Sequence, residues 1–275
     1  MDLALPEFST LAVTLDGAVA EVRLARPEKS NAINGAMWQD IRTAFTWVDG
    51  TPQVRVAVLS GAGRNFCAGI DLAMLLGVQK QIAQADDARS REALRRLILD
   101  LQDCLGAIER CRKPVLAAIH GACVGGALDL VTCCDLRYAA ADAYFSVKEI
   151  DVGMVADVGT LQRLPRLVGE GMARELAFTG RQFDAREARE MGLVNRVIAG
   201  REELAAGVLA LAREIAGKSP LATRGIKEVM NFSRDHSVAD GLNFVATWNA
   251  GMLLSADLQE SLAAAGDRRT PRFAD

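Results

Sequence analysis

Three acidic residues lie within apolar stretches of this sequence and are candidates for proton-transfer chemistry. Asp129 occurs in ALDLVT, Glu149 in FSVKEIDVG and Asp157 in GMVADVGT. Burying an ionised carboxyl group is costly, so an acid in such surroundings is exposed, paired or functional. Burial also raises the pKa of a carboxyl group toward the range in which it exchanges protons near neutral pH. Each acid has a structural interpretation as well: Asp129 as a satisfied helix carboxylate, Glu149 as a solvated strand end, and Asp157 as the N-cap of a helix in VGTLQRLP.

Two glycine-containing loops supply the second chemical signal. AGIDL (68–72) follows one predicted strand, and GACVGGALDL (121–130) follows another and opens a helix. Glycine allows the backbone to approach a ligand closely, and the amides at a helix start point outward with partial positive charge. Such amides suit an oxygen that carries negative charge. Neither loop matches the GxGxxG dinucleotide fingerprint or the Walker phosphate loop.

Cysteine and histidine offer little alternative chemistry. The six cysteines stand in apolar segments without a CxxC pair, so we expect buried, unpaired thiols in a reducing compartment. The chain contains two histidines, His120 and His236, and we expect both to be structural. This scarcity disfavours Ser-His or Cys-His catalysis, and it predicts that the protein has no metal site.

Charge and hydropathy limit the partners. The 275 residues include 32 basic and 35 acidic side chains, for a net charge of −3. We therefore expect no nucleic-acid partner, and, because no apolar run has the length of a membrane span, no membrane partner. The N-terminal MDLALPEFSTLAVTLDG lacks the basic region of a signal peptide, and RRTPRFAD carries no peroxisomal or retention tripeptide. These features predict a cytoplasmic protein.

Hydrophobic periodicity predicts the elements that must position the acids and the loops. Short runs rich in β-branched residues predict strands, and apolar residues at helical spacing predict helices. Residues 79–91 are polar and predict a mobile connection or a helix start. After about residue 200 three helical patterns follow one another and the strands stop. The predicted strands are 11–16, 18–24, 54–60, 113–121 and 136–140, and the predicted helices are 35–48, 92–110 and 125–135. Alternation of strand, loop and helix predicts an α/β core over residues 1–200, with a helical region over 201–275.

The combined motifs resemble the crotonase, or enoyl-CoA hydratase/isomerase, superfamily. The resemblance rests on RNFCAGIDL and on HGACVGGALDLVTCCDLRYAAADAYFSVKEIDVGMVADVGTLQRLPRLVG, and it extends from RPEKSNAIN (26–34) to the helical tail. The string VKEIDVGMVADVGTLQRLP is most similar to the dienoyl-CoA isomerase branch. The resemblance implies a spiral of repeated ββα units, C-terminal helices that form a homotrimer or homohexamer, an acyl-CoA thioester substrate and no cofactor. It also implies a place in lipid metabolism, in fatty acid β-oxidation.

By motif position, the resemblance implies an oxyanion hole made by two backbone amides, those of Ile70 and Gly126. It further implies that substrate-binding residues surround the hole and that RPEKSNAIN borders the CoA moiety. The substrate-binding candidates are Ala68, Gly69, Asp71, Leu72, Lys29 and Ala32.

The three acids distinguish the branches of the family that this chain resembles. In the hydratases two glutamates match positions 129 and 149, whereas this chain has the shorter Asp129 beside Glu149 and adds Asp157. The isomerase branch carries this same set. The resemblance therefore implies conversion of 3,5-dienoyl-CoA to 2,4-dienoyl-CoA through a dienolate, with Glu149 and Asp157 moving protons at C2 and C6 and Asp129 as a modulator. The sequence does not decide which acid serves C2, and Glu149 as the base is our hypothesis. The alternatives are an enoyl-CoA hydratase that uses Asp129 and Glu149, and a non-catalytic acyl-CoA-binding protein.

Overall fold

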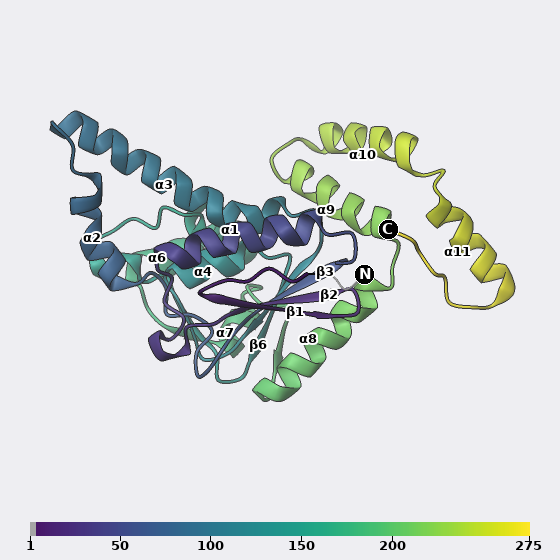
Figure 1. The fold of residues 1–275 in the computed structure, drawn as a ribbon, viewed down its shortest axis with the longest axis horizontal. Helices are drawn as coiled ribbons and strands as arrows, with labels where there is room; N and C mark the ends of the chain where they lie inside the picture. The colour runs from purple at the N-terminus through teal and green to yellow at the C-terminus, as the bar shows by residue number, and fades with distance from the viewer. Residues whose placement is uncertain (1–3) are drawn as a thin grey trace.

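A six-stranded β-sheet forms the centre of the molecule in a computed structural model that describes residues 4–275 (Figure 1). The first two strands form an antiparallel hairpin, and each later strand pairs in parallel with its neighbour. The strand order is β1-β2-β3-β4-β6-β9. The strands are β1 (Leu11–Asp16), β2 (Val19–Leu24), β3 (Val56–Gly61), β4 (Val115–Ile119), β6 (Leu136–Ala140) and β9 (Arg196–Ile198).

A second, three-stranded sheet leads directly into the acidic segments. It has the order β5-β7-β8, with β5 parallel to β7 and β8 antiparallel to β7. Its strands are β5 (Ala122–Val124), β7 (Tyr144–Ser146) and β8 (Phe183–Asp184). Because β5 and β7 are parallel neighbours, the glycine loop that follows β5 and the segment that follows β7 leave the sheet at the same edge.

Helices cover both faces of the large sheet (Figure 1). One face packs against α1 (Gly35–Gly50), α3 (Asp87–Arg110) and α4 (Gly126–Thr132), which contribute to the larger apolar core. The opposite face packs against α8 (Arg201–Ala216), which contributes Leu204, Val208, Ala212 and Ala216 to a second core cluster. The central strands β3, β4 and β6 are buried on both faces, and this explains their nearly continuous apolar sequences.

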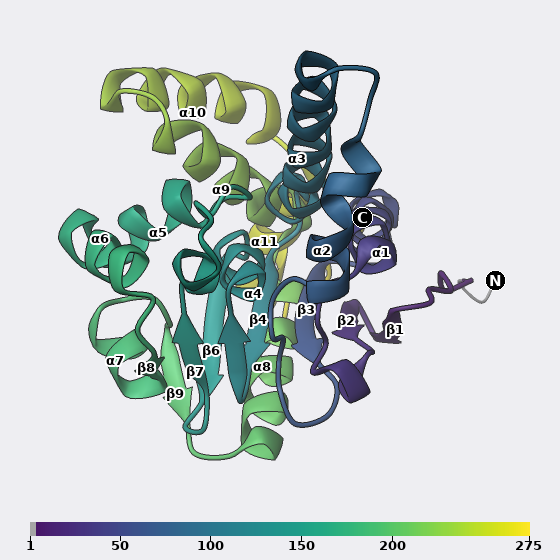
Figure 2. The same ribbon diagram turned by 90° about the vertical axis from the view of Figure 1, so that its left-hand side faces the viewer.

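The segment after the AGIDL loop is more helical than the sequence analysis predicted. α2 spans Leu72–Ile82 and α3 begins at Asp87, so a helix–turn–helix replaces much of the connection expected over residues 79–91. The side chain of Asp71 caps α2 by accepting a hydrogen bond from the amide of Ala73. In Figure 1, α2 and the outer half of α3 project from the body as an arm on the side opposite α10 and α11, and Figure 2 views the molecule from the side of this arm.

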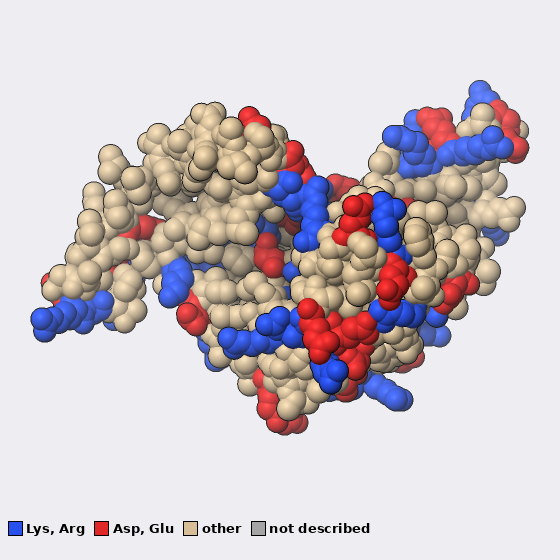
Figure 3. Space-filling model, turned by 180° about the vertical axis from the view of Figure 1, so that it is seen from behind, with Lys and Arg blue, Asp and Glu red and all other residues tan. Residues whose placement is uncertain are grey.

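Six further helices complete the chain. They are α5 (Thr160–Val168), α6 (Glu170–Thr179), α7 (Ala185–Glu190), α9 (Pro220–Arg234), α10 (Val238–Met252) and α11 (Ala256–Asp267). Of these, α6, α7 and α11 were not predicted. Figure 3 shows a broad surface over the C-terminal helices that bears few charged side chains, whereas the opposite arm carries many. The apolar side chains of Val238 and Leu242 on α10 are exposed there.

The predicted α/β class is confirmed, and the division at residue 200 stays a prediction. Within residues 4–275, none of the helices combines the length and the apolar character that a membrane crossing requires. The interpretation of the N-terminus as lacking a signal peptide rests partly on residues 1–3, which lie outside the described residues.

Candidate active site

The amides of Ile70 and Gly126 lie close together and are available to a ligand. Ile33 donates its amide to the carbonyl of Gly69 at 2.8 Å and accepts from the amide of Asp71 at 3.0 Å, so the intervening amide of Ile70 faces the other way. A Cβ built on Gly126 would lie 3.5 Å from the Ile70 nitrogen. Within residues 4–275 neither of the two amides donates a hydrogen bond.

Glycine at two positions makes this approach possible. Gly69 has a φ of +90°, and a Cβ there would lie 2.6 Å from the carbonyl oxygen of Val124 and 3.3 Å from the Gly126 nitrogen. Gly125 has a φ of +56° and is the N-cap of α4, so Gly126 is the first helical residue. The amide of Gly126 therefore combines an open donor with the positive end of the helix.

Asp129 is fully buried one turn into α4. Its Oδ1 accepts a hydrogen bond from the amide of Thr160, the first residue of α5. Its Oδ2 is buried and has no partner within the described residues. Burial raises the pKa of Asp129 to about 6, against the hydrogen bond from Thr160 and the charge of Arg163, which lower it.

Glu149 extends from a 3₁₀ helix, η2 (Lys148–Val152), toward the start of α4. Its Oε1 lies 3.3 Å from the position that a Cβ on Gly125 would occupy, directly beside Gly126. Its Oε2 is buried without a partner in the part of the chain that the structure describes. Burial, followed by the negative charges of Asp129 and Asp157, raises the pKa of Glu149 to about 7.

Asp157 lies half-buried in the loop before α5, and its predicted role as an N-cap is wrong. Gly159 is the N-cap of α5, and the side chain that accepts from the first amide of the helix belongs to Asp129. The Asp157 carboxyl group is therefore not occupied in capping. Its carbonyl oxygen accepts a hydrogen bond from Nε2 of Gln102 at 2.6 Å, and burial raises the pKa of its side chain.

The structure thus brings the three acids close enough for their charges to interact, with Glu149 beside the open amide of Gly126. Asp129 and Asp157 both act on the pKa of Glu149, and Asp157 acts on that of Asp129. Interacting negative charges disfavour ionisation of all three acids together, so the set of Asp129, Glu149 and Asp157 retains a proton near neutral pH. Donors for a developing oxyanion beside acids that hold and release protons suit proton transfer next to a carbonyl group.

The remaining predicted site residues lie in two segments that are bonded to each other. The amide of Ala68 donates to the carbonyl of Ser30 at 2.9 Å, which joins the loop of Gly69 to the segment of Lys29 and Ala32. Asp71 pairs with Arg26 at 3.2 Å. Leu72 opens α2 and is exposed, as is Lys29 at the end of η1 (Pro27–Lys29).

Asn31, in the same segment, holds the neighbouring loop in place and was not singled out from the sequence. Its side-chain amide donates to the carbonyls of Ala62, Asn65 and Phe66, and its φ is +54°. Asparagine is one of the few residues that tolerates such a backbone, so NAIN contained a signal for this position.

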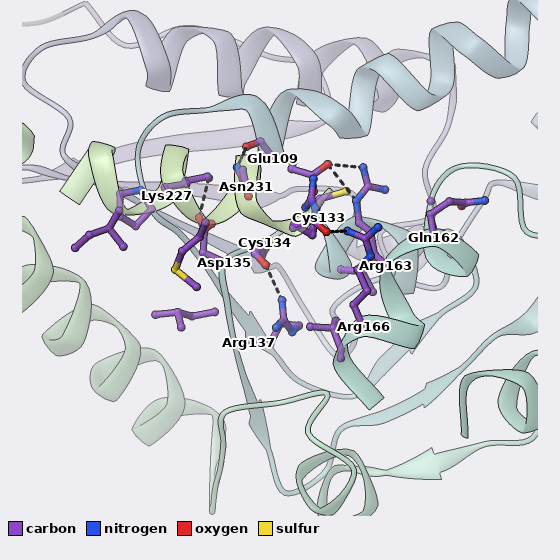
Figure 4. Close-up of a pocket in the computed structure, with 18 of the residues that line it drawn as sticks. Glu109, Cys133, Cys134, Asp135, Arg137, Gln162, Arg163, Arg166, Lys227 and Asn231 are labelled. Carbon is purple, nitrogen blue, oxygen red and sulfur yellow. Dashed lines mark hydrogen bonds and ion pairs between the residues drawn. The ribbon is translucent and has the colours of Figure 1, made fainter. Parts of the chain in front are cut away.

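A large cavity elsewhere in the structure has none of the three acids among its lining residues. It has a volume of about 1130 Å³ and lies between α9, α5 and the end of α4, where Cys133, Arg163, Arg166 and Lys227 are among its lining residues (Figure 4). Neither of the two open amides lines this cavity, and Val158 and Gly159, which do line it, connect it to the loop of Asp157.

The cysteines and histidines lie as expected. All six thiols are buried and unpaired, and burial raises the pKa of Cys67 to about 12. Nε2 of His120 lies 3.0 Å from the carbonyl oxygen of Gly63, and Nδ1 of His236 lies 2.7 Å from that of Phe232. Within residues 4–275 no group of three or more potential ligands is arranged to hold a metal ion.

Residues 14–275 match the model of the enoyl-CoA hydratase/isomerase family, and the chain belongs to that family. It is 47% identical to the peroxisomal Δ3,5-Δ2,4-dienoyl-CoA isomerase of Arabidopsis thaliana over 99% of both chains. It is also 47% identical to the mitochondrial Δ3,5-Δ2,4-dienoyl-CoA isomerase of Homo sapiens, over 91% of this chain and 77% of that one. The crystal structure of enoyl-CoA hydratase from Bacillus anthracis superposes with a TM-score of 0.88 at 30% identity, over 97% of this chain and 99% of that one. The predicted crotonase-like fold is confirmed.

The predicted cytoplasmic location is wrong. The two isomerase relatives described above are named peroxisomal and mitochondrial. The prediction failed because it rested on finding neither a signal peptide nor a peroxisomal or retention tripeptide, and not recognising an address segment does not specify a compartment.

Proposed function

We propose that this protein isomerises 3,5-dienoyl-CoA to 2,4-dienoyl-CoA. The observation that carries the proposal is the pair of open amides, on Ile70 and Gly126, beside Glu149, whose pKa is raised to about 7. The pKa of Asp157 is also raised by burial. The names of the Arabidopsis thaliana and Homo sapiens relatives, each 47% identical to this chain, support the same reaction.

In the proposed mechanism the thioester oxygen accepts hydrogen bonds from the amides of Ile70 and Gly126. Glu149, next to Gly125 and hence next to the thioester end of the substrate, removes a proton from C2. The electron pair spreads through the diene and onto the thioester oxygen, and Asp157 delivers a proton to C6. The double bonds then lie at C2 and C4. Losing one donor from such an oxyanion hole costs roughly 3–4 kcal/mol of transition-state stabilisation.

The proposed mechanism fixes the protonation states of the three acids. The reaction requires Glu149 ionised and Asp157 protonated, so one proton is shared by this pair. Asp129 contributes a fixed negative charge that keeps the proton on the pair. The proton transfer is redox-neutral, and we propose that the enzyme uses no cofactor, since CoA is part of the substrate.

The burial of Asp129 argues against the hydratase alternative. A hydratase of this kind needs two carboxylates around the attacking water, but Asp129 is completely buried and one of its oxygens is engaged by Thr160. The absorbance of a conjugated 2,4-dienoyl-CoA, formed from synthetic 3,5-dienoyl-CoA, tests the proposal. Hydration of 2-enoyl-CoA faster than this isomerisation would favour the hydratase.

The acyl-CoA-binding alternative is tested on a single side chain. Glu149→Gln keeps the size of the side chain and removes its basicity, so isomerisation should be lost. Unchanged activity of this variant toward every acyl-CoA tested would favour a non-catalytic binding protein.

We also propose that the chain forms a homotrimer or a dimer of trimers through its C-terminal helices. The apolar side chains exposed on these helices support this, because large exposed apolar surfaces mark interaction sites. Light scattering after size-exclusion chromatography measures the mass directly. A monomeric mass at micromolar concentration would contradict the proposal.

A further inference from the structure

Arg163 lies on α5, the helix whose first amide donates a hydrogen bond to Asp129. Thr160 donates its amide to Asp129, and Arg163 follows three residues later on α5. The guanidinium group folds back over Gly159, so a Cβ on Gly159 would collide with its Nη1 atom. Gly159 has a φ of +132°, in the region that favours glycine. The backbone before Thr160 is therefore shaped to leave room for this cation.

A second residue fixes the position of Arg163. Oε2 of Glu109, on α3, lies 2.7 Å from Nη2 and 3.3 Å from Nε of Arg163. The other oxygen of Glu109 pairs with Arg234 on α9. The Arg163 and Glu109 side chains are 21% and 18% exposed, so this ion pair is partly shielded from water. Figure 4 shows Arg163 and Glu109 together on the wall of the large cavity, behind α4.

The groups that face Asp129 come from several elements. Glu149 lies on η2, Asp157 on the loop before α5, Cys133 at the end of α4 and Arg163 on α5. Glu149 and Asp157 are acids that compete with Asp129 for a proton, and the Cys133 thiol is neutral because burial raises its pKa. Arg163 is the cation of this set, and its charge lowers the pKa of Asp129 against the effect of burial.

We propose that Arg163 is a positioning residue for isomerisation: held by Glu109 behind α4, it keeps Asp129 ionised and so directs the shared proton to Glu149 and Asp157. The inference rests on the proposed isomerase function. If Asp129 took up the shared proton, Asp157 would be left ionised and could not deliver a proton to C6.

Replacing the charge tests this inference. Arg163→Gln should raise the pKa of Asp129, so the acidic limb of the kcat/KM profile should move up by about one pH unit. We expect kcat to fall and KM to change little, since Arg163 does not contact the substrate. Arg163→Lys retains the charge and should keep the limb near its wild-type position. Arg166→Gln is the matched control, because Arg166 lines the same cavity but pairs with the exposed Asp235.

A carboxyl-carbon NMR titration of ¹³C-labelled aspartate supplies a readout that needs no turnover. The Asp129 signal, assigned by its loss in Asp129→Asn, should titrate at higher pH in Arg163→Gln. An unmoved limb together with an unmoved signal would overturn the inference, as would equal shifts in Arg163→Lys and Arg163→Gln. Arg163→Met repeats the measurement if the glutamine variant does not fold. A moved signal in a protein whose wild type does not isomerise dienoyl-CoA would reject the proposed function and retain the electrostatic role of Arg163.

Discussion

The backbone amide of Thr160, the first residue of α5, donates a hydrogen bond to Oδ1 of Asp129, which lies within α4. This contact engages one oxygen of Asp129 and leaves the other buried without a partner within residues 4–275. Asparagine at position 129 retains an oxygen that can accept from Thr160 and removes the charge. Asp129→Asn therefore separates the charge of this residue from its structural contact.

Asp129→Asn should shift the alkaline limb of the activity profile to lower pH. The negative charge of Asp129 is one of the causes that raise the pKa of Glu149 to about 7. Without that charge the pKa of Glu149 falls, so the pair of Glu149 and Asp157 loses its shared proton at a lower pH. The pH dependence of kcat/KM for 3,5-dienoyl-CoA measures the limb. A limb that stays in place or moves upward would contradict the coupling.

The same substitution should stabilise the protein at alkaline pH. The folded-state pKa of Asp129, about 6, is above its ordinary value of 3.8, so the folded protein favours the neutral form. The associated stability is present below the ordinary pKa and is lost as the pH rises through about 6. At pH 8, Asp129→Asn should therefore exceed the wild type by up to roughly 3 kcal/mol in the free energy of unfolding. Urea denaturation at pH 8 and near pH 3.5 measures the difference, which should be small at the lower pH.

Asp157→Asn should abolish most of the isomerisation while leaving acyl-CoA binding intact. The variant removes the acid proposed for C6, and loss of a general acid lowers rates by roughly 10²–10⁴-fold. Calorimetry with a CoA thioester measures binding, and Asp151→Asn is the control because Asp151 is exposed and pairs with Lys148. A near-normal rate in Asp157→Asn would remove this residue from the mechanism.

Gly126→Pro should lower turnover sharply by deleting one amide of the oxyanion hole. Proline is well tolerated at the first position of a helix, where Gly126 lies. The expected loss is about 10²–10³-fold in kcat. Circular dichroism and thermal melting establish whether the variant folds. A folded variant with undiminished kcat would exclude this amide from the reaction.

Local patterns were sufficient to predict most of the fold. The strand Leu136–Ala140 and the helix that begins at Gly35 follow from apolar periodicity and from glycine, and the structure has both. The helix α2 was missed because its start signal, the Asp71 cap, lies inside a loop whose glycines suggested a ligand site.

Contacts between distant segments limited the prediction of the site. The bond from Thr160 to Asp129 spans 31 residues, and that from Arg163 to Glu109 spans 54. No local pattern encodes such pairs. Asp157 was therefore interpreted as the N-cap of α5, whereas the side chain that accepts from the first amide of α5 is that of Asp129 on α4. The resemblance supplied the amides and the acids by position, whereas the cation behind Asp129 required the packed structure.

The position of α8 against the central sheet limits where the protein can be truncated. The apolar side chains of α8 cover Val56, Val58 and Leu116. A truncation at residue 200 would therefore expose a continuous hydrophobic surface on the central strands. Such a fragment would aggregate rather than report on catalysis. A shortened protein intended for crystallisation or for mapping the active site must keep every residue up to the end of α8.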